Sequence, residues 1–166
     1  MHGRCTVLKI LMGAALGLIL FPASGRAGEN LKLNPHLDYS SDSMDGPHIT
    51  GDHMEDGVAA GKPNYVLIYG EGCYNSKRQS RRTVALYEKY RGRVNFVIID
   101  LDKGPAGAQS ELVRKHYQGS IPHVVILDGN GKSLYDAAGE VSEAEISGIF
   151  EKALAQQGPR SPHPIN

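Results

Sequence analysis

Cysteine and tryptophan are scarce in this sequence of 166 residues, which has no tryptophan and only two cysteines, Cys5 and Cys73. Cys5 lies ahead of an apolar run, residues 10–21, that follows basic residues and is typical of a signal peptide. Small residues close this stretch at Ala27, so residues 1–27 are predicted to be a signal peptide. Cleavage after Ala27 would leave Cys73 as the only thiol, which excludes an internal disulfide.

The sequence also lacks an excess of either charge, since it has 18 basic and 18 acidic residues. Removal of Arg4, Lys9 and Arg26 with the signal peptide takes away no acid and leaves 15 basic residues against 18 acidic ones. A nearly neutral chain argues against nucleic acid as a partner. The apolar run is too short to span a bilayer comfortably, so no stable membrane span is expected after cleavage. We therefore expect a periplasmic or extracellular protein, with a retained N-terminal anchor as the alternative.

Metal-ligand motifs are missing as well, because the chain has neither Cys-x-x-x-Cys nor His-x-x-x-His. Met44, His48, His53 and Met54 lie close together in the sequence, and with Cys73 they offer soft ligands that suit copper(I). Scattered surface residues explain the same pattern. The sequence predicts no resident metal and no cofactor, and copper binding stays open as an alternative.

Cys73 stands where a buried strand is predicted to meet a helix. Residues 65–69 are five consecutive apolar or aromatic residues, which is typical of a strand covered on both faces. Gly70 and Gly72 permit a sharp turn, and residues 76–91 have a helical pattern. Unpaired backbone N–H groups and the helix dipole at such a position favour a thiolate.

The rest of the chain alternates strand and helix patterns. Residues 28–47 are polar and are predicted to be a flexible leader, at most partly docked, and residues 158–166 a frayed tail. Strands are predicted at 48–50, 94–100, 124–127 and 133–135, and helices at 52–60, 109–117 and 142–154. The order β-α-β-α-β-α-β-β-α predicts one domain over 48–157, an α/β protein built as a three-layer α/β/α sandwich with a mixed central sheet.

Three of these segments resemble the thioredoxin family. In that family a central strand runs into Trp-Cys-x-x-Cys at the start of a helix, whereas residues 72–77 here read Gly-Cys-Tyr-Asn-Ser-Lys. Ile121-Pro122 matches the cis-proline dipeptide that faces the cysteine in the family, and residues 128–131 match its hairpin turn. The resemblance covers roughly residues 48–154. It implies a thioredoxin-like fold and thiol–disulfide exchange with protein or small-molecule thiols and disulfides.

The resemblance also implies roles for individual residues. Cys73 would be the nucleophile, while the Ile121 backbone, the cis bond at Pro122 and the adjacent Tyr74 would bind the substrate. Ser76 stands in place of the second cysteine and cannot release a captured partner, because its hydroxyl is a poor nucleophile and forms no disulfide. It would instead cap the helix or donate a hydrogen bond to the thiolate. Release would then need an external thiol, and a dimer through Cys73 stays open.

Other positions depart from the family pattern. Leu67 and Ile98 fall where the family has its buried acid and the lysine that partners it, so these proton-handling groups are missing. An enzyme of monothiol type and a non-catalytic binding module that keeps the groove and the thiol are therefore both open. The basic residues Lys77, Arg78 and Arg82 in the following helix are either an ordinary solvated face or a dock for an acidic partner.

Overall fold

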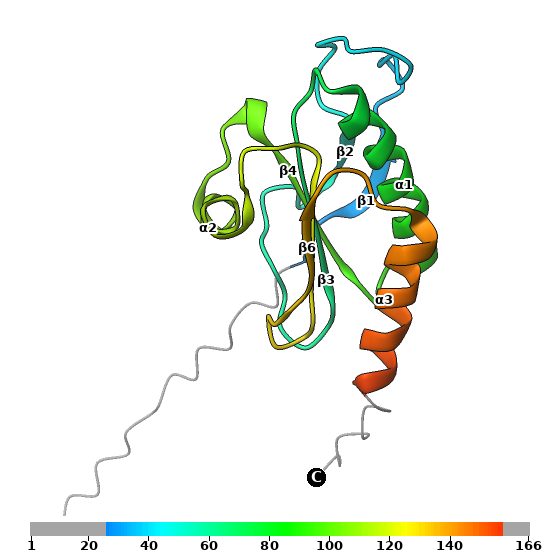
Figure 1. Ribbon diagram of the computed structural model, residues 1–166, viewed down its shortest axis with the longest axis vertical. Coiled ribbons are helices and arrows are strands. Elements are labelled where there is room, and N and C mark those ends of the chain that lie inside the picture. The colour runs from blue at the N-terminus through cyan, green and yellow to red at the C-terminus, as the bar shows by residue number, and fades with distance from the viewer. Residues whose placement is uncertain (1–25, 158–166) are drawn as a thin grey trace, which may run out of the picture.

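The computed structural model describes residues 26–157, so Cys5, most of the predicted signal peptide and the predicted tail lie outside the described residues (Figure 1). In chain order its elements are β1 (Glu29–Leu33), β2 (Ile49–Asp52), β3 (Asn64–Tyr69), α1 (Tyr74–Tyr90), β4 (Asn95–Asp100), a short 3₁₀ helix (Leu101–Lys103), α2 (Gly107–His116), β5 (His123–Leu127), β6 (Ser133–Ala138) and α3 (Glu143–Gln156). None of the helices in this part of the chain is long and apolar enough to cross a bilayer.

The central sheet is mixed and has the strand order β4-β3-β5-β6. β3 pairs in parallel with β4 and antiparallel with β5, and β5 pairs antiparallel with β6. A parallel pair needs a crossover, which α1 provides between β3 and β4. Helices α1 and α3 lie on one side of the sheet and α2 on the other (Figure 1). The predicted α/β/α sandwich with a mixed sheet is confirmed.

Strand β3 is an inner strand of the sheet, and its side chains enter the core on both faces of the sheet. This explains its continuous apolar sequence. The side chains from Tyr65 to Tyr69 are each no more than 1% exposed. Tyr65 and Leu67 pack with Phe150 of α3, while Val66 and Ile68 pack with Leu112 of α2, as the alternation of a strand requires.

Two predictions for the N-terminal part of the chain are wrong. Within residues 28–47, predicted to be flexible and irregular, Glu29–Leu33 forms β1, which pairs antiparallel with β2. Leu31 is only 2% exposed and belongs to the core, whereas its neighbour Lys32 is exposed. Only two of its five residues, Leu31 and Leu33, are apolar, and polar residues surround them, so the strand pattern did not stand out from the polar segment.

The helix predicted at residues 52–60 is also absent, and an irregular segment takes its place. The buried Asn64 side chain accepts a hydrogen bond from the Ala59 N–H and donates to the Ala59 carbonyl oxygen, at 2.7 and 2.8 Å. These are the backbone groups that a helix would use, so Asn64 holds the segment in a loop.

The amino end of β1 lies against β4. Gly28 adopts a φ of +61°, and a Cβ atom there would stand 2.3 Å from the carbonyl oxygen of Phe96, so only glycine fits. The Ala27 N–H donates to the Asn95 side chain at 3.1 Å. The residues on both sides of the predicted cleavage site, Ala27 and Gly28, are thus packed against β4.

If β1 is part of the core, Leu31→Ala should lower the free energy of unfolding by about 3 kcal/mol, because it removes a buried side chain and leaves a cavity. Urea denaturation followed by circular dichroism measures this. Lys32→Ala on the solvent side of the same strand is the matched control and should change stability by less than about 0.5 kcal/mol. Equal effects of the two substitutions would contradict a docked β1.

Candidate thiol site at the start of α1

The turn between β3 and α1 presents Cys73 at the amino end of a long helix. The Cys73 N–H donates to the Gly70 carbonyl at 3.3 Å, and the Cys73 carbonyl accepts the N–H of Lys77 at 3.0 Å. Cys73 has extended backbone angles and is the N-cap residue of α1, yet its side chain makes no capping hydrogen bond. The thiol is free and half-buried, as the helix-terminal position predicted from sequence requires.

The loop before β5 brings Ile121 and Pro122 to this thiol. Cys73 Sγ lies 4.0 Å from the Ile121 carbonyl oxygen, and the Ile121–Pro122 peptide bond is cis. Gly70 permits the approach, since a Cβ atom there would stand 2.7 Å from Ile121 Cδ1. Two segments 48 residues apart in the sequence therefore meet at one site, as the resemblance implies.

Ser76 lies inside the first turns of α1 and is fully buried. Its hydroxyl finds no hydrogen-bond partner among the described residues. The prediction that Ser76 caps the helix is wrong, because α1 already begins at Tyr74. No hydrogen bond joins Ser76 to Cys73 in this arrangement, so the hydroxyl is a buried, unused donor three residues from the thiol.

Tyr74 is the first residue of α1 and is half-buried beside Cys73. The Arg78 guanidinium stands 4.9 Å from the centre of the Tyr74 ring, and the Tyr74 backbone N–H donates to the Asp42 carboxylate at 2.7 Å. The structure thus places Tyr74 at the site, while a role in substrate binding remains a prediction.

Arg78 and Arg82 have a role within the molecule that neither interpretation from sequence included. Both guanidinium groups pair with the Glu140 carboxylate, Arg82 at 2.6 Å. Glu140 belongs to the segment between β6 and α3, so the two arginines fasten α1 to that segment. Arg78 is nevertheless exposed, so the prediction of an ordinary solvated face holds for it. Docking of an acidic partner stays a prediction.

Lys77 is the least expected residue of the site, because its side chain is fully buried. Its ammonium group donates to the Asp38 carbonyl and to the Ser43 hydroxyl, each at 2.7 Å, and lies 3.4 Å from the Asp45 carboxylate. These three acceptors come from residues 38–45, which we call the strap. The sequence predicted Lys77 on an exposed basic face. Its burial is explained by the strap, which the sequence analysis did not predict to pack on α1.

His48 follows the strap and braces the turn that carries Cys73. Its Nε2 is 2.7 Å from the Glu71 carbonyl oxygen and its Nδ1 is 3.2 Å from the Ser80 hydroxyl. A carbonyl only accepts, so Nε2 carries the proton and Ser80 donates to Nδ1. Burial lowers the pKa of His48, which keeps the ring neutral.

The proposed copper ligands are not brought together. Both ring nitrogens of His48 are engaged, Met44 is 67% exposed, and His53 pairs with Asp56. Within residues 26–157 no group of three or more His, Cys, Asp or Glu side chains is arranged to hold a metal ion.

Acidic side chains flank the turn on the side of β4. The Glu71 N–H donates to the Asp102 carboxylate at 2.7 Å, and the Tyr69 hydroxyl donates to Asp100 at 3.0 Å. Burial, followed by a shared hydrogen bond with Asp100, raises the pKa of Glu71. The sequence offered one signal for this acidic cluster. β3 and β4 are parallel, so the residues that follow their carboxyl ends meet at the same edge of the sheet.

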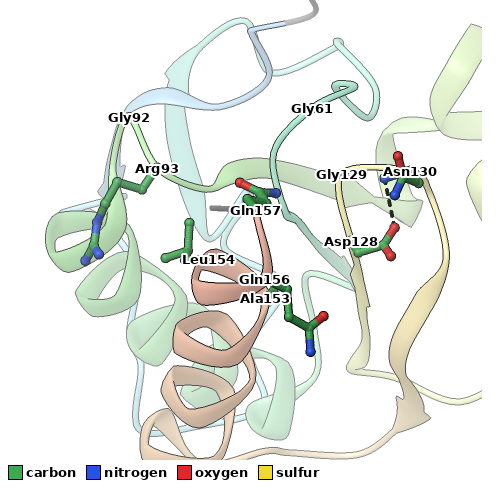
Figure 2. Close-up of a pocket in the computed structure, with 10 residues that line it drawn as sticks. All are labelled: Gly61, Gly92, Arg93, Asp128, Gly129, Asn130, Ala153, Leu154, Gln156 and Gln157. Atoms are coloured by element: carbon green, nitrogen blue, oxygen red, sulfur yellow. Dashed lines mark hydrogen bonds between the residues drawn. The ribbon is translucent and has the colours of Figure 1, made fainter. Parts of the chain in front are cut away.

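A cavity of about 670 Å³ lies at the other end of the molecule, between the amino end of β3 and the end of α3 (Figure 2). Figure 2 shows the Asp128 carboxylate of the β5–β6 turn directed toward the Asn130 backbone N–H, which donates to it at 2.8 Å, and Arg93 at the opposite side of the cavity. No cysteine or histidine lines it, so it has no part in thiol chemistry.

No family model and no curated protein matches this chain. Among solved structures, an uncharacterized thioredoxin-like protein from Clostridium perfringens is similar at 18% identity and a TM-score of 0.51, over 64% of this chain and 82% of that one. The chain has a thioredoxin-like fold. Thioredoxin-2 of a malaria parasite, described as a component of its protein secretion machinery, is 22% identical over 55% of this chain and 82% of its own, with a TM-score of 0.47.

Fasciola hepatica thioredoxin is similar at 18% identity over 57% of this chain and 83% of its own, with a TM-score of 0.45. In this chain the segments at Cys73 and at Ile121-Pro122 face one another. The strap and β1 are the parts of the N-terminal region that sequence reasoning missed.

Acidification should destabilise the protein through His48. Since burial holds the pKa of His48 below its ordinary 6.5, the unfolded chain binds the proton first as the pH falls. The contribution of neutral His48 to stability is present above pH 6.5 and is lost as the pH falls toward the folded-state pKa. Between about pH 7 and pH 5, we expect the melting temperature of His48→Gln to fall by less than that of the unmodified protein. His36 is exposed, so the melting temperature of His36→Gln should change with pH as that of the unmodified protein does. The same change with pH for His48→Gln would contradict a buried neutral ring.

Proposed function

We propose that this protein is an exported, thioredoxin-fold monothiol protein that exchanges disulfides with other proteins through Cys73. The observation that carries the proposal is the position of Cys73 Sγ, at the amino end of α1 and 4.0 Å from the Ile121 carbonyl. The helix end stabilises a thiolate, and the thiolate is the form that attacks a disulfide. Ser76 at the second motif position limits the reaction to one sulfur.

The exchange follows from these groups. The Cys73 thiolate attacks one sulfur of a partner disulfide, a new S–S bond forms, and the partner's second sulfur leaves as a thiolate and takes a proton from water. A second thiol, such as one from a small-molecule pool, then attacks the mixed disulfide and frees Cys73. Ser76 takes no part in this step because a hydroxyl forms no disulfide.

The backbone beside the thiol suits an extended peptide. The β3–β5 ladder ends at His123, so the backbone of Ile121 is left outside the sheet pairing. A partner strand can add there by backbone hydrogen bonds, with its cysteine held against Cys73. This is the same edge that the family resemblance implies for substrate binding.

A non-catalytic binding module is the second candidate. It is favoured by Leu67 and Ile98, which pack in the core beneath the site and are at most 4% exposed, so no proton relay lies at those two positions. The two candidates differ in the nucleophilicity of Cys73. Its rate of alkylation by iodoacetamide as a function of pH measures this property, and a midpoint no lower than that of free cysteine favours the module.

Restoring the second sulfur tests the role of Ser76. In the insulin reduction assay with dithiothreitol, the unmodified protein should stay near the uncatalysed rate, and Ser76→Cys should raise turnover at least about tenfold because it resolves the mixed disulfide within the molecule. Ser133→Cys, an exposed serine on β6, adds a thiol far along the chain from Cys73 and should not. Rapid turnover by the unmodified protein would contradict a monothiol mechanism.

Export predicts a defined mature terminus. Ala27 packs in the core with 4% of its surface exposed, so cleavage after it requires a chain that is still unfolded, as during translocation. Mass spectrometry of the protein expressed from its full sequence should find a chain that begins at Gly28 in the exported fraction. An uncut chain recovered with the membranes would instead favour a retained anchor.

A further inference from the structure

The strap contacts the active-site segment on both sides of Cys73. Met44 Sδ lies over Gly72, where a Cβ atom would come within 2.5 Å of it, and Asp42 accepts the Tyr74 N–H. One turn further along α1, the Lys77 ammonium group is enclosed by strap oxygens. The strap is therefore fixed to the same helix turn that presents the thiol.

Helix α1 has no cap of its own. Cys73 is the N-cap residue but makes no capping hydrogen bond, and the first turn contains no acidic residue. The carboxylate of Asp42 fills this role from outside, since its Oδ1 is 2.7 Å from the N–H of Tyr74. The Asp42 carboxylate thus places a negative charge at the amino end of α1. It contacts Tyr74, the residue that follows Cys73.

Two anions compete for this helix end. A carboxylate at a helix N-terminus is stabilised by the partial positive charge there, and a Cys73 thiolate is stabilised by the same charge. Like charges held near one another disfavour the ionised form of each. The two nearest cations are engaged with other groups. The buried Lys77 ammonium group is bonded to strap oxygens. The Arg78 guanidinium, 4.9 Å from the centre of the Tyr74 ring, pairs with Glu140. On the other side of the turn stand two acids, Glu71 and Asp102, so no free cation offsets the charge of Asp42 among these groups.

The strap has little freedom to withdraw Asp42. Asp38 accepts hydrogen bonds from the hydroxyl groups of Ser40 and Ser41, which lowers its pKa to about 2, so its carboxylate stays charged at ordinary pH. The Asp38 carbonyl and the Ser43 hydroxyl then hold Lys77 from either side of Asp42 in the strap.

We propose that Asp42 is a positioning residue that restrains the reactivity of Cys73 by capping α1 with a negative charge. This inference rests on the proposed function and deepens it. With Asp42 charged, the Cys73 thiolate is less favoured than it would be at a helix end without a carboxylate, and any neutralisation of Asp42 increases the reactivity of Cys73.

The test is the rate of alkylation of Cys73 by iodoacetamide, followed by mass spectrometry of the mature protein from about pH 5 to pH 10. Asp42→Asn keeps an oxygen acceptor for the Tyr74 N–H and removes the charge. We expect its midpoint about half a pH unit below that of the unmodified protein, and hence an approximately threefold faster reaction below the midpoint. The difference should shrink in 1 M salt, because screening weakens charge interactions.

Two further variants separate charge from fold. Asp42→Ala removes both charge and cap, so it should show the same shift in midpoint together with a lower melting temperature. Asp52→Asn, an acid on β2 that binds Asn30, is the control and should leave the midpoint unchanged. Equal midpoints for Asp42→Asn and the unmodified protein would overturn the role of Asp42 and leave the proposed function standing. A thiol that reacts in neither protein would overturn both.

Discussion

The ammonium group of Lys77 has no access to water, and that constraint governs the surroundings of the thiol. Taking a charged amine out of water costs several kcal/mol unless oxygen atoms replace its hydration shell. In this molecule the strap supplies those oxygens, two of them at 2.7 Å. A polar segment that would otherwise stay unstructured is thereby fixed to α1, and Asp42 and Met44 come to lie beside Cys73 as a result.

Local patterns were enough to predict the layers of the fold and the corner that carries the thiol. The buried run of β3 and the capping box of α3, in which the Ser142 hydroxyl accepts the Glu145 N–H at 3.2 Å, are encoded within a few residues of one another. The contacts that were missed join residues far apart in the sequence, such as Lys77 with the strap and Arg82 with Glu140. A basic residue in a helical pattern looks the same in the sequence whether its side chain faces water or pairs with a residue 58 positions away.

Ser76 gives the site its chemical character. Its buried hydroxyl has no partner among the described residues, although a buried donor left without a hydrogen bond usually destabilises a fold by about 1–3 kcal/mol. Ser76 thus places at this position a hydroxyl, which forms no disulfide. Under the proposed function this arrangement holds a partner until another thiol arrives, and the neutral His48 brace keeps the turn fixed in the meantime.

The approach of β1 to β4 has a consequence for solubility. β4 is the end strand of the central sheet; four of its six residues are apolar and five are buried. An uncovered strand of this kind offers its free backbone groups to a second molecule. Gly28 lies against the Phe96 carbonyl oxygen. Gly28 and the strand β1 that follows it therefore cover part of this edge, and their docking guards the folded protein against aggregation.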